Sequence, residues 1–192
     1  DSVASRGLGD VYKRQHATID LETLSTKPDA VVLTIGAVKF DPFTNDPPYS
    51  DFYYRFNVDA QTKIGRHVEE GTLEWWSRQS TEIVEEALSD ENRHDPKHIL
   101  KELNKYLVGV DKIWCQGPCF DIVILENLYR QLGLHWNWAF YNIRDSRTLF
   151  SVMPRDPRKD IDFSAHNALE DCRVQSICCL LYTSDAADDL LC

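Results

Sequence analysis

The sequence predicts one α/β domain built on a mixed, five-stranded sheet flanked by helices. Three observations favour this fold class: apolar residues alternate with a period of two before Asn57, they follow helical spacing after it, and short strands then alternate with helices. The chain has 192 residues, of which 43% are hydrophobic and 27% charged. This composition is that of a globular domain and excludes collagen-like, low-complexity and largely disordered chains.

The N-terminal third predicts a meander of three strands. Residues 17–22, 31–40 and 51–58 are rich in β-branched and aromatic side chains, the composition that strands favour. Residues 41–48 join the second strand to the third and are dense in Asp, Asn and Pro, which do not continue a central strand. We expect a loop there.

Helical spacing predicts helices over residues 68–79 and 80–88. Asp95 and Pro96 are typical of a helix N-cap followed by proline at the first helical position. Further along, we expect a strand over 112–115, a helix over 120–132 that ends at Gly133, a strand over 139–144, and helices over 145–152 and 165–178.

The two ends of the chain differ in character from the rest. Residues 1–15 and 179–192 back-translate into DNA that resembles the adaptors of sequencing libraries. We therefore expect a single domain over residues 16–178, with residues 1–15 and 179–192 as adaptor scars.

Charge and cysteine content narrow the class of protein. A net charge of −10 argues against a grip on long duplex nucleic acid, which needs a broad basic face, but allows a nuclease whose carboxylates hold cations. Cys115, Cys119, Cys172 and Cys178 lack tight CxxC spacing, which favours buried free thiols over a zinc site. Without a span of about 20 apolar residues or a visible secretory segment, we expect no membrane partner and a reducing cytoplasm.

Several acidic residues stand where strands and helices begin or end. Asp20 and Glu22 share one face of the first strand, and Asp121 opens a helix that follows a strand and a Gly-Pro turn. His166 and Asp171 lie at the start of the last helix. Each alone fits a solvated strand face, an acid at a helix N-terminus or an exposed turn. Together they predict convergence at one edge of the sheet, where oxygen ligands suit Mg²⁺ or Mn²⁺.

These residues resemble the three motifs of the DEDDh 3′-to-5′ exonucleases, a group with a ribonuclease H-like fold. The motifs are Asp20-Leu-Glu22, Phe120-Asp121 and His166-Asn-Ala-Leu-Glu-Asp171. Residues 34–38, 75–79, 114–121 and 144–148 resemble more specifically the phage exonuclease A branch. Gln116 departs from that branch, which usually has Asn at this position, and the departure bears on a minor hydrogen bond.

The resemblance implies a catalytic set. Asp20 would bridge two Mg²⁺ or Mn²⁺ ions, with Glu22 and Asp171 completing one cation site and Asp121 holding the second cation through water. His166 would take the proton from the attacking water.

Substrate contacts are expected around this set. The resemblance implies that Thr23 and Leu24 contact the terminal nucleotide, with Leu24 wedged against its base. Trp75 or Trp76, whichever is exposed, is a candidate for stacking on a base, and core packing is the alternative for both. Arg144 and Arg147 are candidates for phosphate contacts, whereas Asp145 reads as a helix N-cap.

Three functions fit the sequence. The leading hypothesis is a metal-dependent 3′-to-5′ exonuclease that releases nucleoside monophosphates from single-stranded DNA or short RNA by two-metal hydrolysis. The second is a catalytically inactive ribonuclease H-like module that binds nucleic acid, which the intact set of acids and His166 disfavours. The third is a structural α/β domain in which the motifs are a coincidence. Single-stranded DNA or RNA 3′ ends are the partners that the first hypothesis requires.

Overall fold

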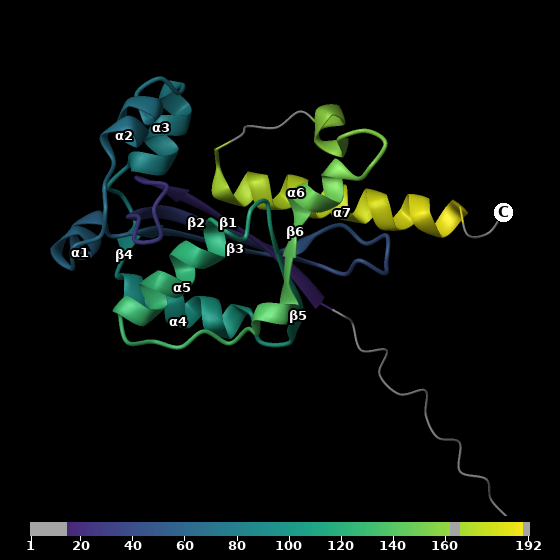
Figure 1. Ribbon diagram of the computed structural model, residues 1–192, viewed down its shortest axis with the longest axis horizontal. Coiled ribbons are helices and arrows are strands. Elements are labelled where there is room, and N and C mark those ends of the chain that lie inside the picture. Colours follow the sequence, from purple (N-terminus) through teal and green to yellow (C-terminus); the bar gives the residue numbers. More distant parts are fainter. Residues whose placement is uncertain (1–14, 162–165, 190–192) are drawn as a thin grey trace, which may run out of the picture.

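The computed structural model describes residues 15–161 and 166–189, and they form a six-stranded sheet flanked by helices (Figure 1). The strand order is β4-β3-β2-β1-β5-β6. The strands are β1 (Gln15–Thr23), β2 (Val32–Phe40), β3 (Tyr49–Phe56), β4 (Arg93–His94), β5 (Val110–Cys115) and β6 (Ile143–Asp145). The predicted α/β class is confirmed, with one strand more than the predicted five.

The helices are α1 (Val58–Lys63), α2 (Glu70–Trp76), α3 (Thr81–Leu88), α4 (Pro96–Tyr106), α5 (Asp121–Gln131), α6 (Ser146–Ser151) and α7 (Ala168–Asp189). Two short 3₁₀ helices, η1 (Phe140–Asn142) and η2 (Pro157–Asp160), lie on either side of β6 and α6 in the chain.

The sheet is mixed, as predicted. β1, β2 and β3 form the antiparallel meander, and β5 then pairs in parallel with β1, while β6 pairs in parallel with β5. The additional strand, β4, is two residues long and pairs in parallel with the end of β3, where Arg55 is the partner of Arg93. A strand this short leaves no periodic signal in the sequence.

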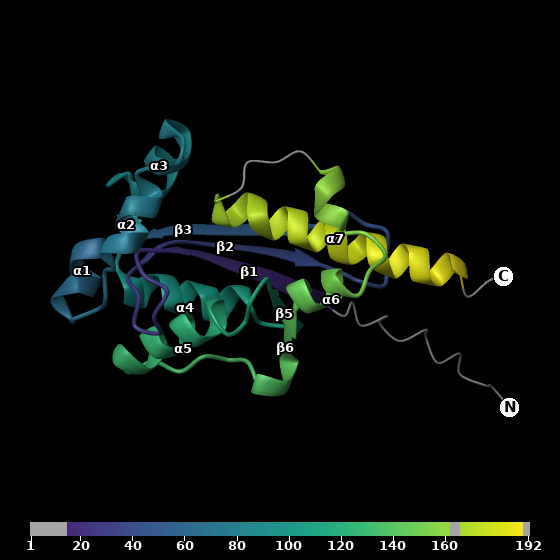
Figure 2. The ribbon, with the colours of Figure 1, turned by 45° about the horizontal axis from the view of Figure 1, so that its top comes forward.

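Helices cover both faces of the sheet (Figures 1 and 2). α4 and α5 pack on one face, and α7 runs along the other. Because side chains alternate along a strand, Ile19 and Leu21 of β1 enter the core beneath α4 and α5, while Thr18 faces α7 and hydrogen-bonds Ser176 (2.8 Å between the hydroxyl oxygens). The same alternation turns Asp20 and Glu22 toward the start of α7.

A glycine in β2 allows α7 to lie directly on the sheet. A Cβ atom at Gly36 would stand 2.2 Å from the carbonyl oxygen of Ala168 and 2.5 Å from the amide nitrogen of Leu169. Real side chains do not approach backbone this closely, so the first turn of α7 requires glycine at this position.

The helix caps and helix ends that the sequence predicts are mostly confirmed. The Asp95 side chain accepts hydrogen bonds from the amides of Lys97 and His98, and Pro96 begins α4. Asp145 caps α6 by accepting from the amide of Arg147 (3.0 Å). The helix after β5 ends near Gly133, which has the expected positive φ of 67°.

Other expectations are corrected. Residues 139–144 are not one strand, because residues 140–142 form the 3₁₀ helix η1 and only Ile143–Asp145 pairs with β5. Helix α1 was not expected; Asn57 caps it by accepting from the amide of Ala60 (2.8 Å). The last helix begins at Ala168 and runs to Asp189, beyond the expected end, and its expected first residue, 165, lies outside the described residues.

The cysteine thiols largely follow the prediction. Cys115, Cys172 and Cys178 are buried and free, whereas Cys119, in the turn before α5, is exposed. Among the residues that the structure describes, no helix combines the length and apolar character needed to cross a membrane.

Candidate active site

Three carboxylates from the two ends of the chain meet between β1 and α7. Asp20 and Glu22 project from β1, and Asp171 projects from the first turn of α7. One carboxylate oxygen of each lies within 4.8 Å of the others. Within the described part of the chain, no other group of three His, Cys, Asp or Glu side chains brings its ligand atoms this close. The convergence predicted for these three acids is therefore present.

Asp121 is the fourth predicted acid, and it stands beside the other three. It opens α5, is 4% exposed, and its Oδ1 accepts a hydrogen bond of 3.2 Å from the amide of Leu21. Because Leu21 lies between Asp20 and Glu22 in β1, this bond ties the start of α5 to the acid-bearing strand. All four acids line one pocket of about 240 Å³.

Burial raises the pKa values of these carboxyls, and repulsion from neighbouring carboxylates adds to it for Asp20 and Glu22. Burial comes first for each, and it raises the pKa of Glu22 to about 8, that of Asp121 to about 7 and that of Asp171 to about 6. Burial and then the neighbouring carboxylates also raise the pKa of Asp20. None of the ion pairs among the described residues involves these four acids. A set of buried and half-buried oxygen donors without an ion-pair partner fits divalent cations such as Mg²⁺ or Mn²⁺.

His166 lies at the rim of the same pocket. Its backbone adopts a left-handed conformation (φ 67°), and its amide donates a hydrogen bond of 2.9 Å to Asp171 Oδ2. The imidazole packs edge-to-face against the indole of Trp75, with 4.8 Å between ring centroids. Burial lowers the pKa of His166, which favours the neutral ring that can accept a proton.

Gln175 is a residue of the site that sequence reasoning missed. Its Nε2 donates a hydrogen bond of 3.2 Å to Asp20 Oδ1, and its Oε1 accepts one of 3.2 Å from the Ser146 hydroxyl. The side chain is buried. The available signal was its position four residues after Asp171, which places both residues on one face of α7.

The two candidate tryptophans differ in exposure. Trp76 is 1% exposed and donates from Nε1 to the carbonyl oxygen of Thr23 (2.9 Å). Trp76 therefore takes the core-packing alternative, with its indole against Leu24 and Leu33, and Trp75 remains the candidate for stacking. Trp75 is 38% exposed and has a surface free to meet a ligand.

The other expected contacts around the terminal nucleotide are largely covered. Leu24 is 6% exposed, so only the edge of its side chain is open to a base. The Thr23 hydroxyl donates a hydrogen bond of 2.8 Å to the carbonyl oxygen of Ser25. Trp76, Thr23 and Leu24 together fix the conformation of the chain at the C-terminal end of β1.

The two candidate arginines have different surroundings. Arg144 donates from Nη1 to the carbonyl oxygens of Tyr141 (2.9 Å) and Ile143 (2.8 Å), and it does not line the acidic pocket. Arg147 does line the pocket, and its charge lowers the pKa of Asp121. Of the two, Arg147 is the one that the structure brings to the acids.

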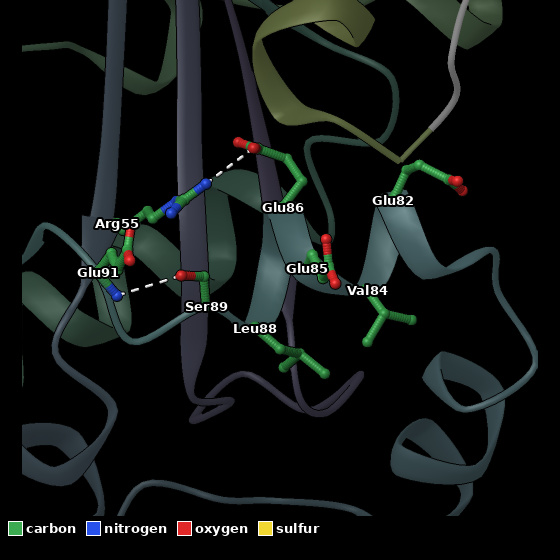
Figure 3. Close-up of a pocket in the computed structure, with 8 residues that line it drawn as sticks. All are labelled: Arg55, Glu82, Val84, Glu85, Glu86, Leu88, Ser89 and Glu91. Carbon is green, nitrogen blue, oxygen red and sulfur yellow. Dashed lines mark hydrogen bonds and ion pairs between the residues drawn. The ribbon is translucent and has the colours of Figure 1, made fainter.

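A larger hollow on α3 offers a contrast (Figure 3). It measures about 710 Å³ and is lined by Glu82, Glu85, Glu86 and Glu91. The basic side chain that lines it is Arg55, whose guanidinium already pairs with the Glu86 carboxylate at 2.8 Å. Figure 3 shows the glutamates pointing in different directions, so they do not gather around one point as the acids of β1 and α7 do. This surface would repel a phosphodiester without offering a compact site for a cation.

Comparison with known proteins agrees with the site. A family model described as the 3′-5′ exoribonuclease Rv2179c-like domain matches residues 15–182. The exodeoxyribonuclease of Enterobacteria phage T4 is 28% identical to the chain over an alignment of 191 residues, which covers 80% of this chain and 82% of the relative.

Solved structures share the fold. E. coli exonuclease I, in a zinc-bound complex with single-stranded DNA, superposes with a TM-score of 0.64 at 14% identity over 91% of this chain. The chain spans 41% of the length of that enzyme. The nuclease domain of 3′hExo, a DEDDh family member bound to rAMP, gives a TM-score of 0.60 at 14% identity, covering 92% of this chain and 94% of the other. The predicted ribonuclease H-like fold is thereby confirmed.

Proposed function

The chain belongs to the 3′-5′ exoribonuclease Rv2179c-like domain family and is a 3′-5′ exonuclease of the DEDDh type, and we propose that it releases nucleoside monophosphates from single-stranded 3′ ends by two-metal hydrolysis. DNA and short RNA are both within this proposal, because the relatives include an exodeoxyribonuclease and the family model describes an exoribonuclease.

One observation carries the proposal. Asp20, Glu22 and Asp171 present oxygens within 4.8 Å of one another, and Asp121 and His166 line the same pocket. Acids placed this closely destabilise the fold unless their charge is neutralised, so their convergence is best explained by a functional need for cations.

The roles of the side chains follow from this arrangement. Two divalent cations, when bound, would stabilise the charge that develops on the attacking and leaving oxygens of the phosphodiester. Asp20 would contact both cations, Glu22 and Asp171 would complete one site, and Asp121 would hold the second cation through water. Water attacks phosphorus, and the bond to the 3′ oxygen of the preceding nucleotide breaks.

His166 is the proposed general base. A neutral imidazole at the rim of the pocket can take the proton of the attacking water, and the burial that lowers its pKa keeps the ring neutral near pH 7. The amide bond to Asp171 fixes the backbone that carries the ring.

The terminal base would stack on Trp75, since this indole is exposed beside His166. Stacking on an aromatic ring is worth about 1–3 kcal/mol and is indifferent to sequence. This indifference suits an enzyme that removes successive nucleotides.

The free thiols of Cys115, Cys172 and Cys178 fit the reducing cytoplasm that the sequence predicts.

A labelled oligonucleotide tests the proposal. A 5′-labelled single strand incubated with Mg²⁺ or Mn²⁺ should yield a ladder that shortens from the 3′ end and is abolished by chelator or by Asp20→Asn. Matched DNA and RNA strands would give the sugar preference. Retention of the strand without shortening would instead support the inactive binding module, and neither binding nor cleavage would contradict both.

A further inference from the structure

A second pocket adjoins the acidic one and shares Arg147 with it. It measures about 440 Å³ and is formed by α6, η2 and the chain between them. Four of its nine lining residues are basic and one is acidic; the basic ones are Arg147, Arg155, Arg158 and Lys159. In a chain of net charge −10, a basic pocket of this kind beside an acidic site is unexpected without a ligand for it. We call it the basic groove.

One arginine of the basic groove is held in place. Arg158 donates to Asp156 from Nε (3.0 Å) and Nη2 (2.6 Å), and its guanidinium lies over the Phe150 ring at 5.5 Å from the centroid. Asp156 also caps η2 by accepting from the Arg158 amide. A guanidinium fixed in this way loses little conformational entropy when it meets an anion.

One arginine connects the basic groove to the acids. Arg147 lines both the groove and the pocket that contains Asp20, Glu22, Asp121 and Asp171. The groove therefore opens on the side of the acidic pocket formed by α6 and η2. An anionic strand that reaches the acids from this side would meet positive charge first.

The opposite side of the pocket has the reverse character. In Figures 1 and 2, α2 lies beyond the start of α7, whereas α6 lies farther along that helix. α2 carries Glu70 and Glu74 and is preceded by Glu69, and the indole of Trp75 packs against His166, which lines the pocket. A base can stack there, whereas a run of phosphates would be repelled. The two sides therefore suit different parts of a strand.

We propose that the basic groove binds the phosphodiester backbone of the strand upstream of the bond that is cleaved. This inference rests on the proposed function and adds the path of the substrate: the terminal base lies toward Trp75, and the preceding phosphates lie along the four basic residues of the groove, Arg147, Arg155, Arg158 and Lys159. The enzyme then favours strands of several nucleotides over the shortest ones, and its affinity depends on ionic strength.

The double variant Arg155→Gln/Lys159→Gln tests the basic groove. It leaves Arg147 at the acids and the Arg158–Asp156 pair intact. Two substrates are compared: an eight-residue oligothymidylate, and the p-nitrophenyl ester of thymidine 5′-monophosphate, which has no upstream phosphate. The ratio of kcat/KM for the oligonucleotide to that for the ester should fall about tenfold. The slope of log kcat/KM against log salt should become shallower by roughly 1.4, because each lost phosphate contact removes about 0.7.

The matched control is Lys97→Gln/Lys101→Gln, which removes two exposed charges of α4 on the far face of the sheet. The control should keep both the ratio and the salt slope of the wild type. An unchanged ratio in the groove variant, or an equal change in both variants, would overturn the proposal.

Binding separates this inference from the proposed function. Fluorescence anisotropy of the labelled oligothymidylate, measured in chelator, reports the basic groove whether or not the strand is cleaved. Weaker binding by the groove variant alone would support the groove even if the wild type cleaved neither substrate. Equal binding by wild type and groove variant would overturn it.

Discussion

Gln175 donates a hydrogen bond from Nε2 to Asp20 Oδ1, so a neutral amide of the last helix orients the carboxylate of the first strand. The Ser146 hydroxyl donates to Gln175 Oε1 and thereby fixes which end of the amide faces Asp20. Three elements, β1, α6 and α7, are joined through this buried chain of side chains. Asp20 holds its orientation without a cationic neighbour that would compete with a metal ion.

Gln175→Ala should weaken cation binding. Removing a partner that orients a metal-binding carboxylate typically costs 10- to 100-fold in metal affinity or activity. Titration calorimetry with Mn²⁺ would measure the change. Gln131→Ala, at a glutamine on α5 whose amide donates to the carbonyl oxygen of Ile64, serves as the control and should bind Mn²⁺ as the wild type does. Wild-type affinity in Gln175→Ala would show that Asp20 needs no such support.

His166→Ala should lower kcat by about 100-fold or more, because the general base is lost. Cation affinity should be retained, since the amide that donates to Asp171 belongs to the backbone and survives the substitution. Single-turnover cleavage and Mn²⁺ titration on the same preparation separate the two quantities. Turnover near that of the wild type would exclude His166 as the base.

Trp75→Ala should lower kcat about tenfold, because the imidazole of His166 loses the ring against which it packs. Trp75→Phe should retain most of the activity. If Trp75 served only to stack on the base, KM would rise while kcat stayed constant. The NMR shifts of the His166 ring protons should change in Trp75→Ala, and they should remain unchanged in Phe140→Ala, which removes a remote, exposed ring.

Gly36→Ala should destabilise the protein and weaken cation binding together. The added Cβ would stand 2.2 Å from the Ala168 carbonyl oxygen, so the first turn of α7 must move and carry Asp171 with it. Gly71→Ala is the matched control, because no atom lies within 4 Å of its added Cβ and alanine favours the helix. Thermal melts should show a lower Tm for Gly36→Ala and an equal or higher Tm for Gly71→Ala.

Stability without a cation should fall as pH rises from about 4 to about 8. Folding raises the pKa of Asp171 to about 6, that of Asp121 to about 7 and that of Glu22 to about 8, so the folded protein binds more protons than the unfolded chain over this range. A divalent cation at about 100 times its Kd should add about 2.7 kcal/mol, or roughly 5–10 °C in Tm.

The control for this pH dependence is Glu22→Gln, which removes one of the raised carboxyls. Melts in chelator should show a smaller loss of Tm between pH 5 and 8 in this variant than in the wild type. A wild-type Tm loss equal to that of Glu22→Gln would contradict the repulsion described for the pocket.

Features with a local cause could be predicted from the sequence. The strand meander follows from alternation, and the start of α4 follows from Asp95 and Pro96, because capping depends on neighbours in the chain. The convergence of Asp20 with Asp171 was predicted because their positions at element ends, together with the connection rules of α/β sheets, bring distant residues to one edge.

Features that depend on packing could not be predicted. The pairing of β4 has no pattern in the sequence, and the spacing of Gln175 from Asp171 does not reveal its contact with Asp20, because each arises only when the element meets its partner. The same holds for Trp75 and Trp76, adjacent residues of which one enters the core and the other stays exposed. Which of the two indoles points toward the pocket depends on how α2 packs against the C-terminal end of β1.

The separation of 155 positions between Asp20 and Gln175 has a consequence for biosynthesis. A ribosome completes β1 early, but the acids of this strand have no partner until α7 emerges from the exit tunnel. A nascent chain therefore cannot complete the centre until the start of α7 has left the tunnel.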